Sequence, residues 1–248
     1  MSPITPANLS VQRLLAWTGP VLMVVFFLGF WVMGHFIPPP SPTRTPEQVV
    51  AFFRDHPTQK RVGLFLVSFA GALVCTWSVA ISCQLKRIEG AVAPLAYVQM
   101  LFGALLALEF IFPTFVWQTI LYRPDTTSTE LTYRLNDLAW LPFVGVVSTG
   151  VLQATSIGIA TLLDPGPDRV FPRWISYFNF WVALTFMPAG FVVFFKSGPL
   201  AWNGMLAWWL LLVSFFSWVV VMTALILGNL RKQGATLAAT RASDPAPA

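Results

Sequence analysis

Long apolar runs alternate with short polar segments along most of the chain. This pattern predicts six membrane-spanning helices, because an apolar run of about 18 or more residues matches the thickness of a bilayer's hydrocarbon core. The fold class is therefore all-α, an integral membrane bundle in which residues 1–232 form a single transmembrane domain. The expected spans are about 14–37, 62–85, 94–121, 138–163, 174–195 and 203–230.

A short amphipathic helix is expected over residues 45–56, between the first two spans. Thr45 can cap its N-terminus, Pro46 suits the first helical position, and Gln48 can complete a capping box. Apolar residues follow, and a polar segment containing Pro57 ends the helix. Because the helix is too short to cross the bilayer, we expect it to lie in the headgroup region.

Polar turns and a tail complete the prediction. Ser128 or Thr129 is expected to cap the helix that follows the third span, and the fourth span is expected to be entered through a polar turn over residues 134–137. Pro188 is expected to kink the fifth span. Residues 233–248 are rich in Ala, Thr and Pro, so we expect a disordered tail.

Composition agrees with a membrane protein. Apolar residues make up 56% of the chain and charged residues only 10%, against about 25% charged in soluble domains. The net charge of +5 is therefore attributed to basic residues at span ends, which set topology and meet anionic headgroups. It does not indicate binding to nucleic acid. The lipid bilayer is the expected partner.

Basic residues decide the expected orientation by a narrow margin. With the N-terminus inside, the inner segments carry eight Lys and Arg residues and the outer segments seven. Arg231-Lys232 at a span end and Lys86-Arg87 in a tight turn are typical cytoplasmic anchors. We therefore expect a multi-pass protein of the bacterial cytoplasmic membrane with both termini in the cytoplasm.

Several kinds of chemistry lack the residues that they need. Cys75 and Cys83 are eight apart in one expected helix, so they predict neither a disulfide nor a metal site. Both histidines fall in the first outer loop, and no span has a His, Cys and carboxylate cluster, so no cofactor or metal is expected. An enzyme would have only Glu109 and Asp137 as an acid–base pair, at different depths, which argues against catalysis.

Glu109 is the residue most suggestive of function. It lies about midway along the third span, and no Lys or Arg occurs at comparable depth in any span. An ionised acid there would cost about 2.5 kcal/mol or more, so we expect a neutral carboxyl for much of the time. The functional interpretation is a proton relay or a counter-ion for a cationic ligand. The structural interpretation is a hydrogen bond to Thr185, Gln153 or a carbonyl freed by Pro113.

Polar and small residues mark the faces of three spans. In the third span, Gln99 and Trp117 fall on one side with Glu109 at its edge, and the fourth span has a broad polar face that includes Gln153. If these spans are neighbours, the faces line a cavity or form interhelical hydrogen bonds, worth about 0.6 kcal/mol each. A stripe in the second span indicates close helix packing or a polar pathway. Its members are Ser68, Gly71, Cys75, Ser78 and Ser82.

The outer half of the bundle holds the remaining candidates. Arg134 and Asp137 can pair across one helical turn, or Asn136 and Asp137 can form a polar mouth with Asn203. Six tryptophans crowd this half, as an interfacial belt or as the lining of a pocket for a lipophile or an organic cation. They are Trp31, Trp117, Trp140, Trp202, Trp208 and Trp209.

Three segments resemble those of uncharacterised bacterial multi-pass membrane proteins, grouped as a domain of unknown function. They are Thr45–His56, Asn136–Phe143 and Gly198–Gly204. The resemblance extends over the spans in general and implies a topology, but no activity.

The sequence favours a membrane protein that binds a hydrophobic or amphipathic small molecule in an aromatic-rich cavity of the outer half, without covalent chemistry. The alternatives are a proton-coupled transporter that uses Glu109, and an accessory or structural subunit with a membrane partner or a second copy of itself. The candidate residues for binding a ligand or a proton are Glu109, Asp137, Gln153, Trp117, Trp140 and Asn203.

Overall fold

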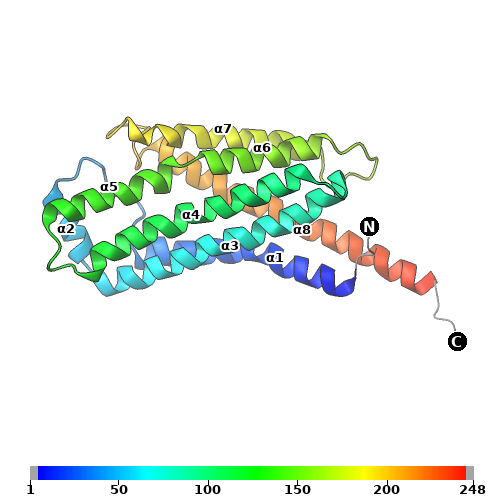
Figure 1. Ribbon diagram of the computed structural model, residues 1–248, viewed down its shortest axis with the longest axis horizontal. Coiled ribbons are helices and arrows are strands. Elements are labelled where there is room, and N and C mark those ends of the chain that lie inside the picture. The colour runs from blue at the N-terminus through cyan, green and yellow to red at the C-terminus, as the bar shows by residue number, and fades with distance from the viewer. Residues whose placement is uncertain (1–4, 244–248) are drawn as a thin grey trace.

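The computed structural model describes residues 5–243 and shows an elongated helical bundle (Figure 1). Six of its helices are long and apolar enough to cross a membrane, which confirms the predicted class and number of spans. The first helix begins and the last helix ends at the same end of the bundle, which we call the terminal end. The opposite end holds the short helix α2, and we call it the α2 end.

Four of the six spans change helix type or break along their length. Helices η1 and η3 are π-helical and η2 is 3₁₀. The spans are α1 (Pro6–Phe26) with η1 (Phe27–Met33), α3 (Pro57–Glu89), α4 (Pro94–Tyr122), α5 (Thr129–Gly145) with α6 (Ser148–Leu162), α7 (Trp174–Phe186) with η2 (Met187–Val193), and η3 (Met205–Trp209) with α8 (Leu210–Ser243).

The short amphipathic helix is confirmed as α2 (Pro46–Arg54). The Thr45 side chain accepts a hydrogen bond from the Gln48 amide at 3.4 Å, and the Gln48 side chain accepts one from the Thr45 amide at 3.0 Å. Val49 and Phe53 are buried against the bundle. Pro57, expected only to end this helix, begins α3 as its first residue, where a missing amide costs no hydrogen bond.

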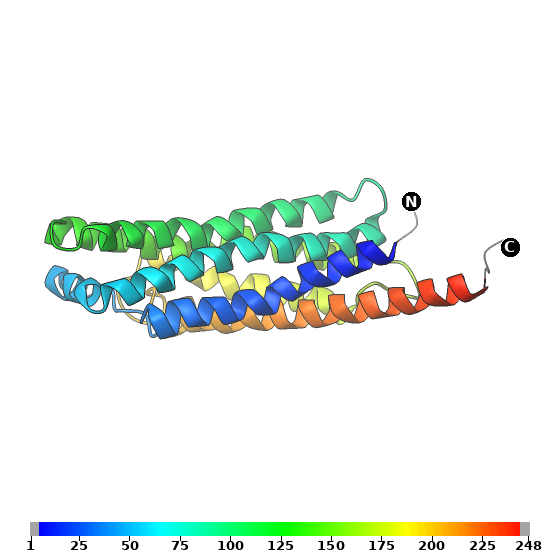
Figure 2. The same cartoon turned by 90° about the horizontal axis from the view of Figure 1, so that it is seen from below.

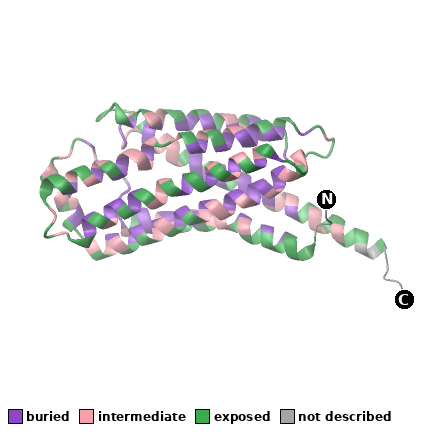
Figure 3. Cartoon of the chain, viewed as in Figure 1, coloured by how far each residue is buried: buried purple, intermediate pink, exposed green. Residues whose placement is uncertain are grey.

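Small residues allow α3 to pack closely against its neighbours. A Cβ at Gly71 would lie 2.7 Å from the Cβ of Phe110 on α4, and a Cβ at Gly63 would collide with the Gly29 carbonyl of η1. Figure 2 shows α3 between α1 and α4, and Figure 3 shows the buried positions facing the bundle interior. In the small-residue stripe, Gly71 therefore acts in helix packing, as small residues do where lipid gives no hydrophobic drive, whereas Ser78 and Ser82 accept hydrogen bonds from side chains of α6 and α4.

The fourth span differs most from its prediction as one helix over 138–163. The Ser128 hydroxyl caps it, accepting from the Leu131 amide at 3.3 Å, so α5 begins at Thr129 and the expected turn at 134–137 is helical instead. The span then breaks at Val146 and Val147. Pro142 within α5 lacks an amide donor, which weakens the helix just before the break.

The predicted disordered tail is wrong over residues 233–243, because α8 continues to Ser243. Its Ala-rich sequence favours a helix, and Leu237 packs against the core, lining a groove together with Leu9 of α1. Residues 244–248 lie outside the described part of the chain. The first helix likewise begins earlier than predicted, at Pro6, because Thr5 caps it through the Asn8 amide.

Candidate functional site

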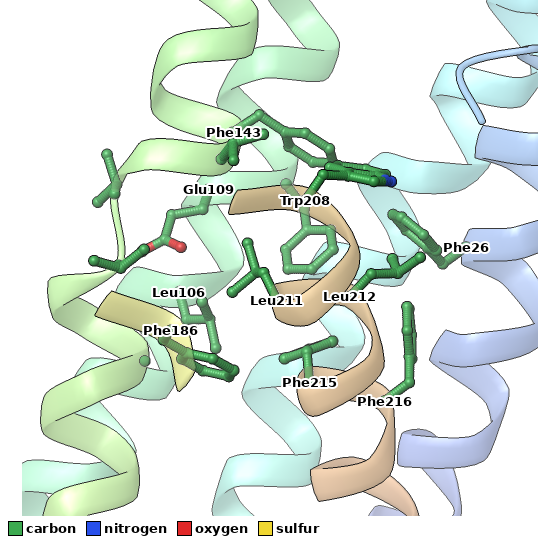
Figure 4. A pocket seen from close by; sticks show the side chains of 15 residues that line it. Phe26, Leu106, Glu109, Phe143, Phe186, Trp208, Leu211, Leu212, Phe215 and Phe216 are labelled. Carbon is green, nitrogen blue, oxygen red and sulfur yellow. The ribbon is translucent and has the colours of Figure 1, made fainter. Parts of the chain in front are cut away.

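A small cavity lies among the spans, and Glu109 is one of its lining residues (Figure 4). Its volume is about 60 Å³, below the roughly 300–1,000 Å³ of pockets that enclose a drug-sized ligand. Apart from Glu109, the lining residues are apolar or aromatic and carry no titratable side chain. They are Phe26, Leu106, Phe110, Phe143, Val144, Val146, Val147, Gly150, Phe186, Trp208, Leu211, Leu212, Phe215 and Phe216.

The break between α5 and α6 supplies the partner of Glu109. Thr149, in the first turn of α6, donates a hydrogen bond from its hydroxyl to the Glu109 carboxyl. Because Thr149 is the second residue of α6, the carboxyl also lies near the positive end of a helix dipole. The structural partner is therefore Thr149, and not Thr185, Gln153 or a carbonyl freed by Pro113 as the sequence suggested.

Irregular helix geometry surrounds the cavity on its other sides. The fifth span changes to the 3₁₀ helix η2 at Met187, next to Phe186, which lines the cavity. Pro188 lies at this change, in agreement with the predicted kink. The sixth span begins as the π-helix η3, which places Trp208 on the cavity wall. Three spans therefore depart from regular α-helix beside one carboxyl.

Gln153, one helical turn beyond Thr149 in α6, lies in a fully buried polar cluster between α3, α4 and α6. Its Nε2 donates to Ser78 Oγ at 2.9 Å and to Gln99 Oε1 at 3.2 Å. The Gln99 amide in turn donates to the Ser78 carbonyl at 2.7 Å and to Ser82 Oγ. The third and fourth spans are thus neighbours, and interhelical hydrogen bonds join their polar faces.

Trp117 and Trp140 are fully buried in an aromatic cluster toward the α2 end. Their rings lie 5.0 Å apart, and Trp140 stacks on Trp202 at 6.1 Å. Phe30 and Phe36 pack against both tryptophans. The interfacial belt expected for these tryptophans is wrong for Trp117, Trp140, Trp202 and Trp208, which are core residues, whereas Trp31 is 55% exposed.

Asp137 and Asn203 are not brought together at the cavity. Within residues 5–243, the side chains of Asp137 and Asn203 form no hydrogen bond with each other. Neither side chain lines the cavity around Glu109. Arg134 pairs with Glu130 at 2.7 Å, one turn earlier in α5, and not with Asp137 as expected. The i,i+4 spacing in the order Glu then Arg favours this pair.

Sequence reasoning placed Thr149 with Gln153 on the polar face of the fourth span but did not pair it with Glu109, and it missed the two α8 residues Leu212 and Phe216. Leu212 and Phe216 also line a groove of about 460 Å³ between α1 and α8, so they separate this groove from the cavity. The sequence signal for a helix break just before Thr149 was the run Gly145-Val146-Val147. These three residues have weak helix propensity and come shortly after Pro142. Among the described residues, no group of three or more His, Cys, Asp or Glu side chains could hold a metal ion.

Comparison with protein-family models, curated proteins and solved structures finds no match for this chain. The architecture and the cavity therefore stand on the chain's own geometry.

Proposed function

We propose that this membrane protein binds an amphipathic small molecule through the cavity at Glu109. The observation that supports the proposal is a single carboxyl, held by one hydroxyl, on an otherwise apolar cavity wall within the bundle. Polar groups in such surroundings are costly and mark functional sites by default. A cationic head group would neutralise the carboxyl where the lining offers no basic side chain.

The size of the cavity indicates which part of the ligand it holds. About 60 Å³ suits a head group of a few atoms, such as an ammonium, and not a whole lipophile. The apolar groove between α1 and α8 lies directly behind Leu212 and Phe216. We propose that the hydrocarbon chain of the ligand lies in this groove, with the head group passing between these two side chains.

The cavity, rather than the tryptophan-rich region, is thus the proposed binding site. Trp117 and Trp140 pack against each other and against phenylalanines, and they do not themselves line the cavity. Glu109 is the proposed polar anchor. Asp137, Asn203 and Gln153 do not line the cavity, so we propose no direct contact between these residues and the ligand.

Equilibrium binding of a radiolabelled long-chain alkylamine to the protein in nanodiscs tests the proposal, with empty nanodiscs as background. Saturable binding is expected, and Glu109→Gln should weaken it about tenfold or more, since a hydrogen bond to a charged group is worth about 1.5–3 kcal/mol. Glu130→Gln, on an exposed side chain, is the matched control. Equal binding by wild type and Glu109→Gln, or no saturable binding, would contradict the proposal.

Proton-coupled transport is the second candidate, and the broken fourth span favours it. Transporters commonly place discontinuous helices at a binding site near the bilayer midplane, and α6 begins beside Glu109. Proteoliposomes with a trapped pH dye would report amine-dependent proton movement. This movement should disappear in Glu109→Gln if the protein transports, and should be absent from wild type if it only binds.

We further propose the bacterial cytoplasmic membrane as the location, with the terminal end in the cytoplasm. Lys86-Arg87 and Arg231-Lys232 both lie toward this end, near the end of α3 and within α8. Basic residues near span ends favour the cytoplasmic side. Protease digestion of a C-terminal tag in spheroplasts would test the orientation.

A further inference from the structure

The side chains between Glu109 and the terminal end form a nearly continuous polar column. It begins with the hydrogen bond between Glu109 and Thr149. Gln153 lies one helical turn further along the same face of α6, and such i,i+4 neighbours are about 5–6 Å apart. Gln153 then bonds to Ser78 and Gln99, which opens the polar cluster between α3, α4 and α6.

The column continues from this cluster to the turn between α3 and α4. Ser82 accepts from Gln99 and donates to the Ala96 carbonyl at 2.8 Å. The amide of the same residue, Ala96, donates to Glu89 at 2.7 Å. Glu89 is the last residue of α3 and is partly exposed at the terminal end. Polar groups therefore follow one another from the membrane interior to a partly exposed acid, with the backbone of Ala96 between Ser82 and Glu89.

One acceptor in the column has no protein partner. Gln153 is fully buried, and its Oε1 makes no hydrogen bond within the described part of the chain. Buried polar atoms are nearly always paired, with ordered water where protein groups are lacking. Gly103 lets Ser78 and Gln153 pack closely against α4, because a Cβ there would collide with Ser78 and lie 2.8 Å from Gln153 Nε2.

Toward the α2 end, the described residues form no chain of side-chain hydrogen bonds that starts at Glu109. Toward the α2 end the bundle is filled by Phe30, Phe36, Trp117, Trp140 and Phe143, with ring centroids about 5–6 Å apart. The residues that surround the Glu109 carboxyl from α1, α5, α6, α7, η3 and α8 carry no titratable side chain. Among the described residues, side chains joined by hydrogen bonds thus lead away from Glu109 only toward the terminal end, whereas the indole N–H groups of Trp117, Trp140 and Trp208 on the other side are isolated donors without a partner.

We infer that Glu109 exchanges its proton with one side of the membrane only, through a water-assisted path along Thr149, Gln153, Ser78, Gln99 and Ser82 to the terminal end. The proton that leaves Glu109 enters bulk water near Glu89, so the step needs no further reactant. This inference does not need a ligand in the cavity. In this path Gln153 is a positioning residue: its side chain orders the water that carries the proton, and it does not carry the proton itself.

Infrared spectroscopy can measure the hydrogen–deuterium exchange of the carboxyl, identified as the band that is lost in Glu109→Gln. In D₂O, Gln153→Leu should slow this exchange about tenfold, since it removes a hydrogen-bonded step from an apolar interior. The matched control is Gln118→Leu, in the α2-end half of α4, where the side chain bonds only the Arg61 carbonyl. If Gln153→Leu fails to fold, Ser78→Ala tests the same step by removing one hydroxyl. Unchanged exchange in the folded path variant, or equal slowing in the control, would overturn the path.

Sidedness needs a second measurement in sealed proteoliposomes sorted by the accessibility of a C-terminal tag. A pH jump outside the vesicles should change the Glu109 band where the terminal end faces outward, and leave it unchanged where this end faces inward. The inference would be overturned if the Glu109 band changed only in vesicles whose α2 end faces outward, in both vesicle populations, or in neither. Because amine binding is measured separately, a failure here is distinguishable from a failure of the proposed function.

Discussion

The contacts of helix α4 differ on the two sides of Glu109. Toward the α2 end, aromatic rings from η1, α4, α5 and η3 pack against one another. Toward the terminal end, amide and hydroxyl side chains of α3, α4 and α6 bond across the helix interfaces. The same helix α4 contributes Trp117 to one half and Gln99 to the other.

This difference shows that two kinds of packing hold one membrane bundle together. Lipid gives no hydrophobic drive for association, so shape-matched contacts and polar contacts must provide it. Large rings give many dispersion contacts. Small and amide side chains let the helices approach closely and leave acceptors, such as Gln153 Oε1, for water. Glu109 lies where the two kinds meet.

The largest expected effect comes from a truncation in the aromatic half. Trp117→Ala should lower the stability of the protein by about 3–5 kcal/mol, because it opens a cavity in a fully buried cluster. Thermal unfolding in detergent, followed by size-exclusion chromatography, measures the change. Trp31→Ala removes a ring that is 55% exposed and is the control. Equal losses in the two variants would mean that the aromatic cluster is not a packed core.

A smaller effect is expected in the polar half. Gln153→Leu should cost only about 1 kcal/mol, since it removes two interhelical bonds worth about 0.6 kcal/mol each and keeps most of the side-chain volume. The same unfolding assay applies. A loss as large as that of Trp117→Ala would contradict the division into an aromatic core and a weakly bonded polar path.

The smallest effect is expected at the surface of the α2 end, as a pH dependence. His56 hydrogen-bonds Asp55 at 2.5 Å and holds the pKa of this carboxyl below its ordinary value. A depressed folded-state pKa gives stability that is present above the unfolded value and is lost as the pH falls through the folded value. The region around α2 should therefore loosen slightly below about pH 4, seen as faster amide hydrogen exchange after correction for intrinsic rates. Asp55→Asn should remove this dependence, and a dependence that survives would contradict its assignment to Asp55.

Much of the fold follows from the sequence, because local chemistry decides it. The apolar runs fix six spans, and Thr45, Pro46 and Gln48 fix α2 through a capping box whose groups are three residues apart. Glu109 stands out because a lone acid in a long apolar run is costly. These features need no knowledge of which helices are neighbours.

The remaining features depend on contacts between distant residues. The helix over residues 233–243 gains from the packing of Leu237 against the core beside α1. Thr149 meets Glu109 beside the break in the fourth span, where α5 ends at Gly145 and α6 begins at Ser148. The burial of Trp140 depends on Trp202, which is 62 positions later in the chain. The many tryptophans predicted an interfacial belt that includes Trp140, whereas tertiary packing buries Trp140 in the core.

The central claim is that Glu109 is the polar anchor for a cationic amphiphile, and the infrared difference spectrum of its carboxyl tests this most directly. The spectrum would be recorded in nanodiscs before and after addition of a long-chain alkylamine, with Glu109→Gln to identify the band. The account predicts that the amine converts the protonated carboxyl band into a carboxylate band, and that the neutral alcohol of equal chain length does not. A carboxyl band that the amine leaves unchanged, while the amine binds the protein, would contradict the account.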